Sequence, residues 1–120
     1  MYEIVSEKEG RALGVTIREA FAPADREQVT AYLREQSAGH GQIAVLFDLD
    51  DLPPASVDDV VDGLADGLAE ARGVTRVAVV GNEHWERREQ RLSAVFPAAE
   101  IQFFGVAHLA EAWSWIRGKV

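Results

Sequence analysis

Three short segments follow three apolar runs in this sequence, and they carry the side chains best suited to bind a ligand. The acidic segment begins at Asp48, and the other two begin at Gly81 and Gly105. In an open α/β sheet the C-terminal ends of parallel strands meet at one edge, and ligands bind there where the strand order reverses. We therefore expect a ligand or partner site at this edge, formed by Asp50, Asp51, Asn82, His84 and Trp85.

The acidic segment also resembles a catalytic motif. Residues 44–51 read as an apolar strand ending in Asp-x-Asp, like the first motif of haloacid-dehalogenase-type phosphatases. That resemblance implies Asp48 as nucleophile, Asp50 as acid/base and a bound magnesium ion. The next apolar run ends at Gly81 without the Ser or Thr that binds phosphate in that family, and the only later lysine is Lys119. Because phosphoryl transfer depends on charge neutralisation, we keep a magnesium-dependent phosphatase only as the alternative function.

Other catalytic and cofactor sites have little support in the sequence. The segment 81–83 has one glycine and lacks the spacing of a phosphate-binding loop. The three histidines are too scattered for metal-ligand spacing, and the chain has no cysteine, which excludes a thiol catalyst and a zinc finger. We expect no enzyme activity, no cofactor and no metal.

The pattern of apolar residues predicts the elements that position these segments. Val15 and Ile17 alternate with Thr16 and Arg18, as in a strand with one face in solvent. Apolar residues recur at helical spacing from Val57 to Ala71. We predict the order β-β-α-β-α-β-α-β-α, a mixed and mostly parallel sheet flanked by helices. The predicted strands are 2–5, 15–17, 43–49, 77–80 and 101–104. The first predicted helix runs from Pro23 to about Gly39–Gly41 and the second from Ser56 to about Gly73. The third runs from Asn82 to about Pro97 and the last from Leu109 to about Ile116.

Length, composition and charge restrict the class of protein. The 120 residues predict one domain, 1–120, with 48% hydrophobic residues. The net charge of −8 argues against nucleic acid as a partner. The longest apolar run, 43–47, is far too short to span a membrane. With no signal peptide evident at the N-terminus, we expect a cytoplasmic protein.

Five segments together resemble the SpoIIAA-like family of small bacterial proteins, which is related to STAS domains. They are the early hairpin, the acid-ending strand 43–50, the run 76–85 (Arg-Val-Ala-Val-Val-Gly-Asn-Glu-His-Trp) and the terminal runs 101–104 and 111–113. The resemblance implies a STAS/SpoIIAA-like sheet with helices, no catalysis, and binding of a protein partner or a small ligand. A likeness of some members to the lipid-carrying CRAL-TRIO fold implies an apolar or amphipathic ligand.

The resemblance also directs attention to Ser56. Anti-sigma antagonists with a STAS fold carry a phosphorylatable serine before the helix that follows the third strand, and Ser56 occupies that place here. This serine lacks the preceding acid and the following glycine of the family pattern, and helix N-capping accounts for it. Ser56 is the candidate phosphosite.

Two further predictions concern association and the role of Trp85. Asp59, Asp62 and Asp66 form an acidic stripe, and Arg87, Arg88 and Arg91 a basic one. Opposite stripes favour a weak, salt-sensitive homodimer. Trp85 is followed at helical spacing by Leu92 and Phe96, which favours a buried ring, whereas its polar neighbours favour the rim of a binding site.

Overall fold

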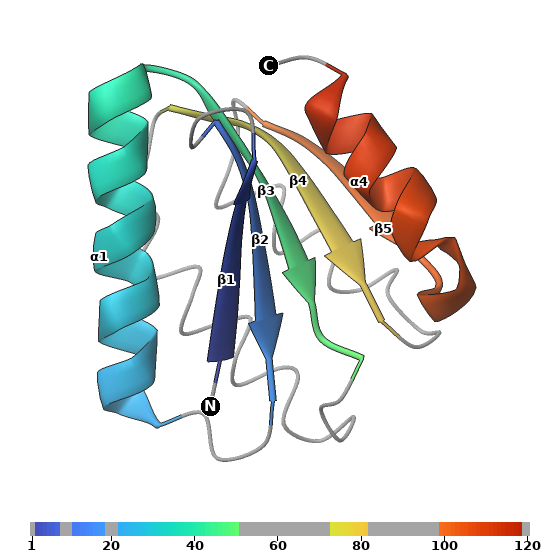
Figure 1. The fold of residues 1–120 in the computed structure, drawn as a ribbon, viewed down its shortest axis with the longest axis horizontal. Coiled ribbons are helices and arrows are strands. Elements are labelled where there is room, and N and C mark those ends of the chain that lie inside the picture. Colours follow the sequence, from blue (N-terminus) through green and yellow to red (C-terminus); the bar gives the residue numbers. More distant parts are fainter. Residues whose placement is uncertain (1, 8–10, 19–21, 51–72, 82–98, 119–120) are drawn as a thin grey trace.

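The computed structural model describes residues 2–7, 11–18, 22–50, 73–81 and 99–118 (Figure 1). The helices predicted to begin at Ser56 and Asn82 lie outside these residues. Elsewhere the element order is the predicted one. The described elements are β1 (Tyr2–Glu7), β2 (Ala12–Ile17), α1 (Pro23–His40), β3 (Ile43–Asp48), β4 (Val74–Val80), β5 (Glu100–Phe104), the 3₁₀ turn η2 (Val106–His108) and α4 (Leu109–Arg117).

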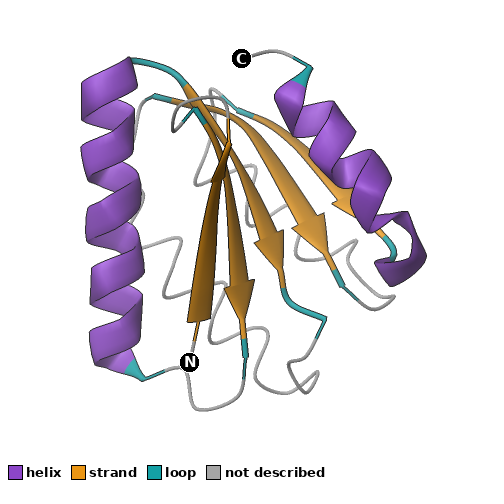
Figure 2. Ribbon diagram, viewed as in Figure 1, coloured by secondary structure: helices purple, strands orange, loops and turns teal. Residues whose placement is uncertain are grey.

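The five strands form one sheet in which spatial order equals chain order, β1-β2-β3-β4-β5 (Figure 2). The predicted hairpin is confirmed, because β1 pairs antiparallel with β2. The remaining neighbours are parallel, and one continuous row of Cα partners crosses the sheet from Val15 through Phe47 and Val79 to Phe103. The sheet is therefore mixed and mostly parallel, as predicted, with its antiparallel pair at the β1 edge.

Local signals determine the limits of α1. Pro23 occupies the first helical turn, where a missing N–H costs nothing, and the Asp25 carboxylate accepts a hydrogen bond of 3.1 Å from the Ala22 N–H. The helix ends at Gly41, whose φ of 78° lies in the left-handed region that favours glycine. The Gly41 N–H donates to the Ser37 carbonyl at 2.9 Å. Gly39 is still helical, so Gly41 alone produces the predicted stop.

One face of the sheet packs against α1 through large aliphatic side chains. Every second residue of the inner strands points to this face, as strand geometry requires. Helix α1 contributes Val29 and Leu33, which are fully buried. The buried members of this cluster are Leu13, Val15, Ile17, Val29, Leu33, Ile43, Val45, Phe47, Leu49, Val74, Val77 and Val79. These side chains form the larger of two cores.

The opposite face is covered by α4, which lies mainly across β3 and β4, and its sheet side combines small residues with Leu46 and Val80. Ala12, Ala44 and Ala78 are fully buried there beside Ala112 and Ile116 of the helix. A Cβ on Gly14 would overlap the indole ring of Trp113, so the ring occupies the space that glycine leaves on β2. The alternation predicted at 15–18 is present, because Val15 and Ile17 are buried, Thr16 is half-buried and Arg18 is exposed. The start of β2 is buried on both faces, since α4 covers Ala12 and Gly14.

Candidate functional site

The C-terminal ends of β3, β4 and β5 lie side by side, as the sequence predicts. The Leu49 N–H donates to the Val80 carbonyl at 2.8 Å, and the Gly81 N–H donates to the Phe104 carbonyl at 3.2 Å. Asp48 and Asp50 are half-buried at this edge. The Asp50 N–H donates to Asp48 Oδ1 at 3.2 Å, the bond of an Asx turn. These acids thus help to turn the chain away from the sheet.

The expected crevice at a reversal of strand order is not found in the described sheet, because its five strands follow one another in chain order. A sequential order has no point at which neighbouring crossovers diverge and leave a gap. Four of the five predicted site residues, Asp51, Asn82, His84 and Trp85, lie outside the described residues, as do Ser56 and the two charge stripes. Asp50 is the one member of the predicted set that the structure places.

The described histidines lie at different ends of the sheet. His40 is in the last turn of α1, next to the start of β3, whereas His108 precedes α4 beyond the end of β5. His108 Nδ1 lies 3.1 Å from Glu111 Oε1. Within residues 2–7, 11–18, 22–50, 73–81 and 99–118, no group of three or more His, Asp or Glu residues is arranged to hold a metal ion.

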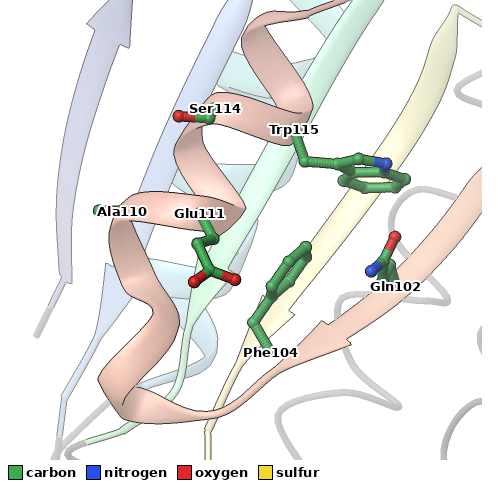
Figure 3. A pocket seen from close by; sticks show the side chains of 6 residues that line it. All are labelled: Gln102, Phe104, Ala110, Glu111, Ser114 and Trp115. Atoms are coloured by element: carbon green, nitrogen blue, oxygen red, sulfur yellow. The ribbon is translucent and has the colours of Figure 1, made fainter.

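A groove of about 520 Å³ lies between β5 and α4, open to solvent along one side (Figure 3). It forms because α4 lies mainly across β3 and β4 and leaves part of β5 uncovered. The side chains of alternate residues of β5 point to this face. The lining residues are Gln102, Phe104, Ala110, Glu111, Ser114 and Trp115. The groove is shallow and widely open to solvent.

Two aromatic rings form the apolar walls of the groove. Phe104 from β5 and Trp115 from α4 have ring centroids 5.9 Å apart and planes inclined by 53°, a tilted arrangement that aromatic pairs favour. Both side chains are only half-buried, and Figure 3 shows them beside the amide of Gln102. The groove therefore offers apolar ring surface to solvent with a hydrogen-bonding amide next to it.

Arg76, on β4, contacts Trp115 from the sheet side and fixes this wall of the groove. Its side chain is only 11% exposed, although it belongs to an otherwise apolar strand, β4. The guanidinium Nη1 donates to the Trp115 carbonyl at 2.5 Å, and its carbon lies 4.6 Å from the centre of the Trp115 ring. Nη2 lies 3.7 Å from the carboxylate of Glu100, the cross-strand partner of Arg76. One cation thus binds the ring, the helix and β5 together.

The same contact satisfies the C-terminal end of α4. Carbonyls in the last turn of a helix have no partner within the helix and carry partial negative charge. The Trp115 carbonyl accepts from Arg76, the Ser114 carbonyl accepts from the Gly118 N–H at 3.1 Å, and the Trp113 carbonyl accepts from Arg117 Nε at 3.2 Å. Helix α4 is therefore fixed to the sheet at the end that carries Trp115.

Sequence reasoning did not single out Trp115, Phe104 or Arg76. The signal for Arg76 is present, because an arginine within the apolar run 74–80 has to be buried and therefore needs partners. The spacing of Trp113 and Trp115 turns the two rings to different sides of α4. Leu109, predicted and found as the start of the last helix, is 36% exposed, since the sheet contacts of α4 begin one turn later at Ala112.

A five-stranded mixed sheet with helices on both faces is consistent with a STAS/SpoIIAA-like α/β fold. The SpoIIAA-like family model matches residues 12–117 of this chain, so the protein belongs to the SpoIIAA-like family. The resemblance noted in the sequence is thereby confirmed. No curated protein matches the chain. None of the helices in the described part of the chain is long and apolar enough to cross a membrane.

Proposed function

We propose that this chain is a non-enzymatic regulatory domain that binds a protein partner through the groove between β5 and α4. The family supports the general class, because SpoIIAA-like and STAS domains are generally non-enzymatic binding modules. One observation supports the location: Phe104 and Trp115 keep ring surface exposed, although the rest of the α4 face is tightly packed. Aromatic residues exposed in this way are enriched at interfaces.

Site-specific photo-crosslinking in cells tests this proposal. A photoreactive amino acid at Ser114, on the groove, is expected to capture a partner that the same group at Ser6, on the exposed β1 edge, does not. Phe104→Ala should abolish capture, whereas Phe103→Ala is the matched control because Phe103 packs on the α1 face. Equal capture from both positions, or capture unaffected by Phe104→Ala in a folded variant, would contradict the proposal.

A small apolar or amphipathic ligand is the other binding hypothesis. Native mass spectrometry of freshly purified protein reports such a ligand as added mass, and the same spectrum reports the subunit count. A retained apolar molecule that is lost in Phe104→Ala would assign the groove to a small ligand instead of a protein. The binding residues predicted near the sheet edge, Asp51, Asn82, His84 and Trp85, and the phosphosite Ser56 stay predictions.

The alternative of a magnesium-dependent phosphatase depends on Asp48 and Asp50. One oxygen of Asp48 is engaged with the Asp50 N–H in the described turn, and no finding beyond the Asp-x-Asp spacing supports phosphoryl transfer. We therefore expect no magnesium-dependent hydrolysis of an aryl phosphate. Turnover that disappears in Asp48→Asn would replace the binding function by this enzymatic one.

A further inference from the structure

We infer that the groove between β5 and α4 takes an arginine side chain from a basic segment of the partner protein. This inference depends on the proposed function and specifies the chemistry that the groove recognises. It is carried by three features of the described residues: the charge of the groove, the stacking surfaces of its walls, and the way in which the carboxylate of Glu111 is held.

The charge around the groove favours a cation. Glu111 is the one charged side chain among the six lining residues, and it is 70% exposed. Glu100, on the same face of β5, is 62% exposed and lies 3.7 Å from Nη2 of Arg76. The charge carried by the lining residues themselves is therefore negative. The whole chain has a net charge of −8, so it attracts basic partners over a longer range as well.

The walls suit a guanidinium with its aliphatic stem. Arg76 already shows that a guanidinium stacks on Trp115, at 4.6 Å from the ring centre. Phe104 presents a second ring within the groove, close to Glu111 (Figure 3). A long side chain can lay its methylene groups on such rings and keep its charged head at the solvent side. Arginine is favoured over lysine because its planar head stacks on rings and pairs with a carboxylate in a fixed geometry.

The carboxylate of Glu111 is held in place before any partner arrives. Its Oε1 lies 3.1 Å from His108 Nδ1, and in Figure 3 the carboxylate points toward the ring of Phe104. Within the described residues, Oε2 has no hydrogen-bond partner and can accept from an incoming guanidinium. A carboxylate already oriented by a neighbour loses less conformational entropy when it binds.

The test compares two peptides that differ only in the charged group. Acetyl-Ala-Arg-Ala-amide and its citrulline analogue have nearly the same shape, and each is titrated into the intact chain while amide NMR signals are followed. We expect the arginine peptide to shift the signals of Phe104, Glu111 and Trp115 and to bind about fivefold more tightly, the sum of an exposed ion pair and a cation–π contact. The difference should decrease as salt is added.

Two variants locate the effect. Glu111→Gln keeps the shape of the groove and should reduce the preference for arginine to roughly twofold or less. Glu35→Gln, at an exposed position on α1, removes the same charge elsewhere and should change nothing. Equal affinity for the two peptides, an unchanged preference in Glu111→Gln, or shifts confined to other surfaces would overturn the inference. So would the absence of binding at about 10 mM peptide, far above the roughly millimolar affinity of a single weak contact.

The outcomes also separate this inference from the proposed function. If both peptides shift the groove signals equally, or if an apolar molecule displaces both peptides, the groove is a binding site whose occupant is not an arginine. If the groove signals shift with protein concentration alone, a second copy of the chain is the occupant and the partner assignment is wrong. If photo-crosslinking from Ser114 and the peptide titration both fail to detect the groove, the proposed function itself is wrong.

Discussion

The two faces of the sheet are packed by different rules. Against α1 the sheet presents branched and aromatic side chains, and the helix adds Val29, Leu33 and the partly buried Tyr32. Against α4 the sheet presents three alanines and Gly14 beside Leu46 and Val80, and the small residues leave room for the indole of Trp113. Because α4 lies mainly across β3 and β4, the rings of Phe104 and Trp115 beside β5 stay partly exposed.

The comparison predicts the largest loss of stability on the α1 face. Leu33→Ala removes a fully buried side chain and should lower the free energy of unfolding by about 2–5 kcal/mol. Urea unfolding measures the change. Glu35→Ala on the exposed side of the same helix is the control and should stay within about 0.5 kcal/mol. A loss for Leu33→Ala no greater than that of the control would show that α1 is not the principal packing partner of the sheet.

On the α4 face we expect stability to be lost through overcrowding of side chains and not through the formation of a cavity. Gly14→Ala places a methyl group where the Trp113 indole lies and should cost about 1–3 kcal/mol. A double-mutant cycle with Trp113→Leu measures the conflict directly. The double variant should lose clearly less stability than the sum of the two single variants, since the smaller side chain vacates the space. Additive losses would mean that the ring and the glycine do not compete for one position.

Substitution of Arg76 should disturb the Trp115 wall of the groove more than it lowers the stability of the fold. Arg76→Met keeps the length of the stem but removes the hydrogen bond to the Trp115 carbonyl and the stacked cation. We expect a loss of about 1–2 kcal/mol together with a weaker near-ultraviolet circular dichroism signal from the released indole. Arg76→Lys should restore part of the stability without restoring the signal. A full tryptophan signal in Arg76→Met would show that packing alone fixes the Trp115 wall.

The smallest effect is expected at Gly39, a glycine with open space around it. Gly39→Ala at this helical position should raise the free energy of unfolding by about 0.5–1 kcal/mol, because alanine loses less conformational entropy in a helix. Thermal unfolding followed at 222 nm measures this gain as a rise of a few degrees in the melting temperature. Gly14→Ala should lower the free energy of unfolding and Gly39→Ala should raise it. The two variants thus distinguish a glycine that packing requires from one that packing does not require. A destabilised Gly39→Ala would remove that distinction.

Most of the described fold could be predicted from the sequence because its signals are local. The apolar runs 43–47 and 77–80 identify β3 and β4 to within a few residues, and Pro23 and Gly41 determine the ends of α1. The hairpin follows from the short polar segment between β1 and β2. Each of these signals acts within a few residues of the element that it defines.

The groove could not be predicted in the same way, since it depends on where α4 lies across the sheet. No local pattern states that Trp113 meets Gly14, about a hundred residues earlier, or that Arg76 reaches the carbonyl of Trp115. Strand order is equally non-local, so the sequence alone could not tell whether the order reverses at this edge; in the described sheet it does not. The placed residue Asp50 forms part of a turn, whereas the groove is formed by residues that looked like ordinary core or surface.

The sequential strand order has a consequence for how the chain folds during synthesis. Each strand after β1 adds to an edge that has already left the ribosome, so no gap in the sheet has to wait for a later segment. The groove residues 102–115 belong to the last described elements along the chain. The two walls of the groove, β5 and α4, are therefore the last of these elements to leave the ribosome.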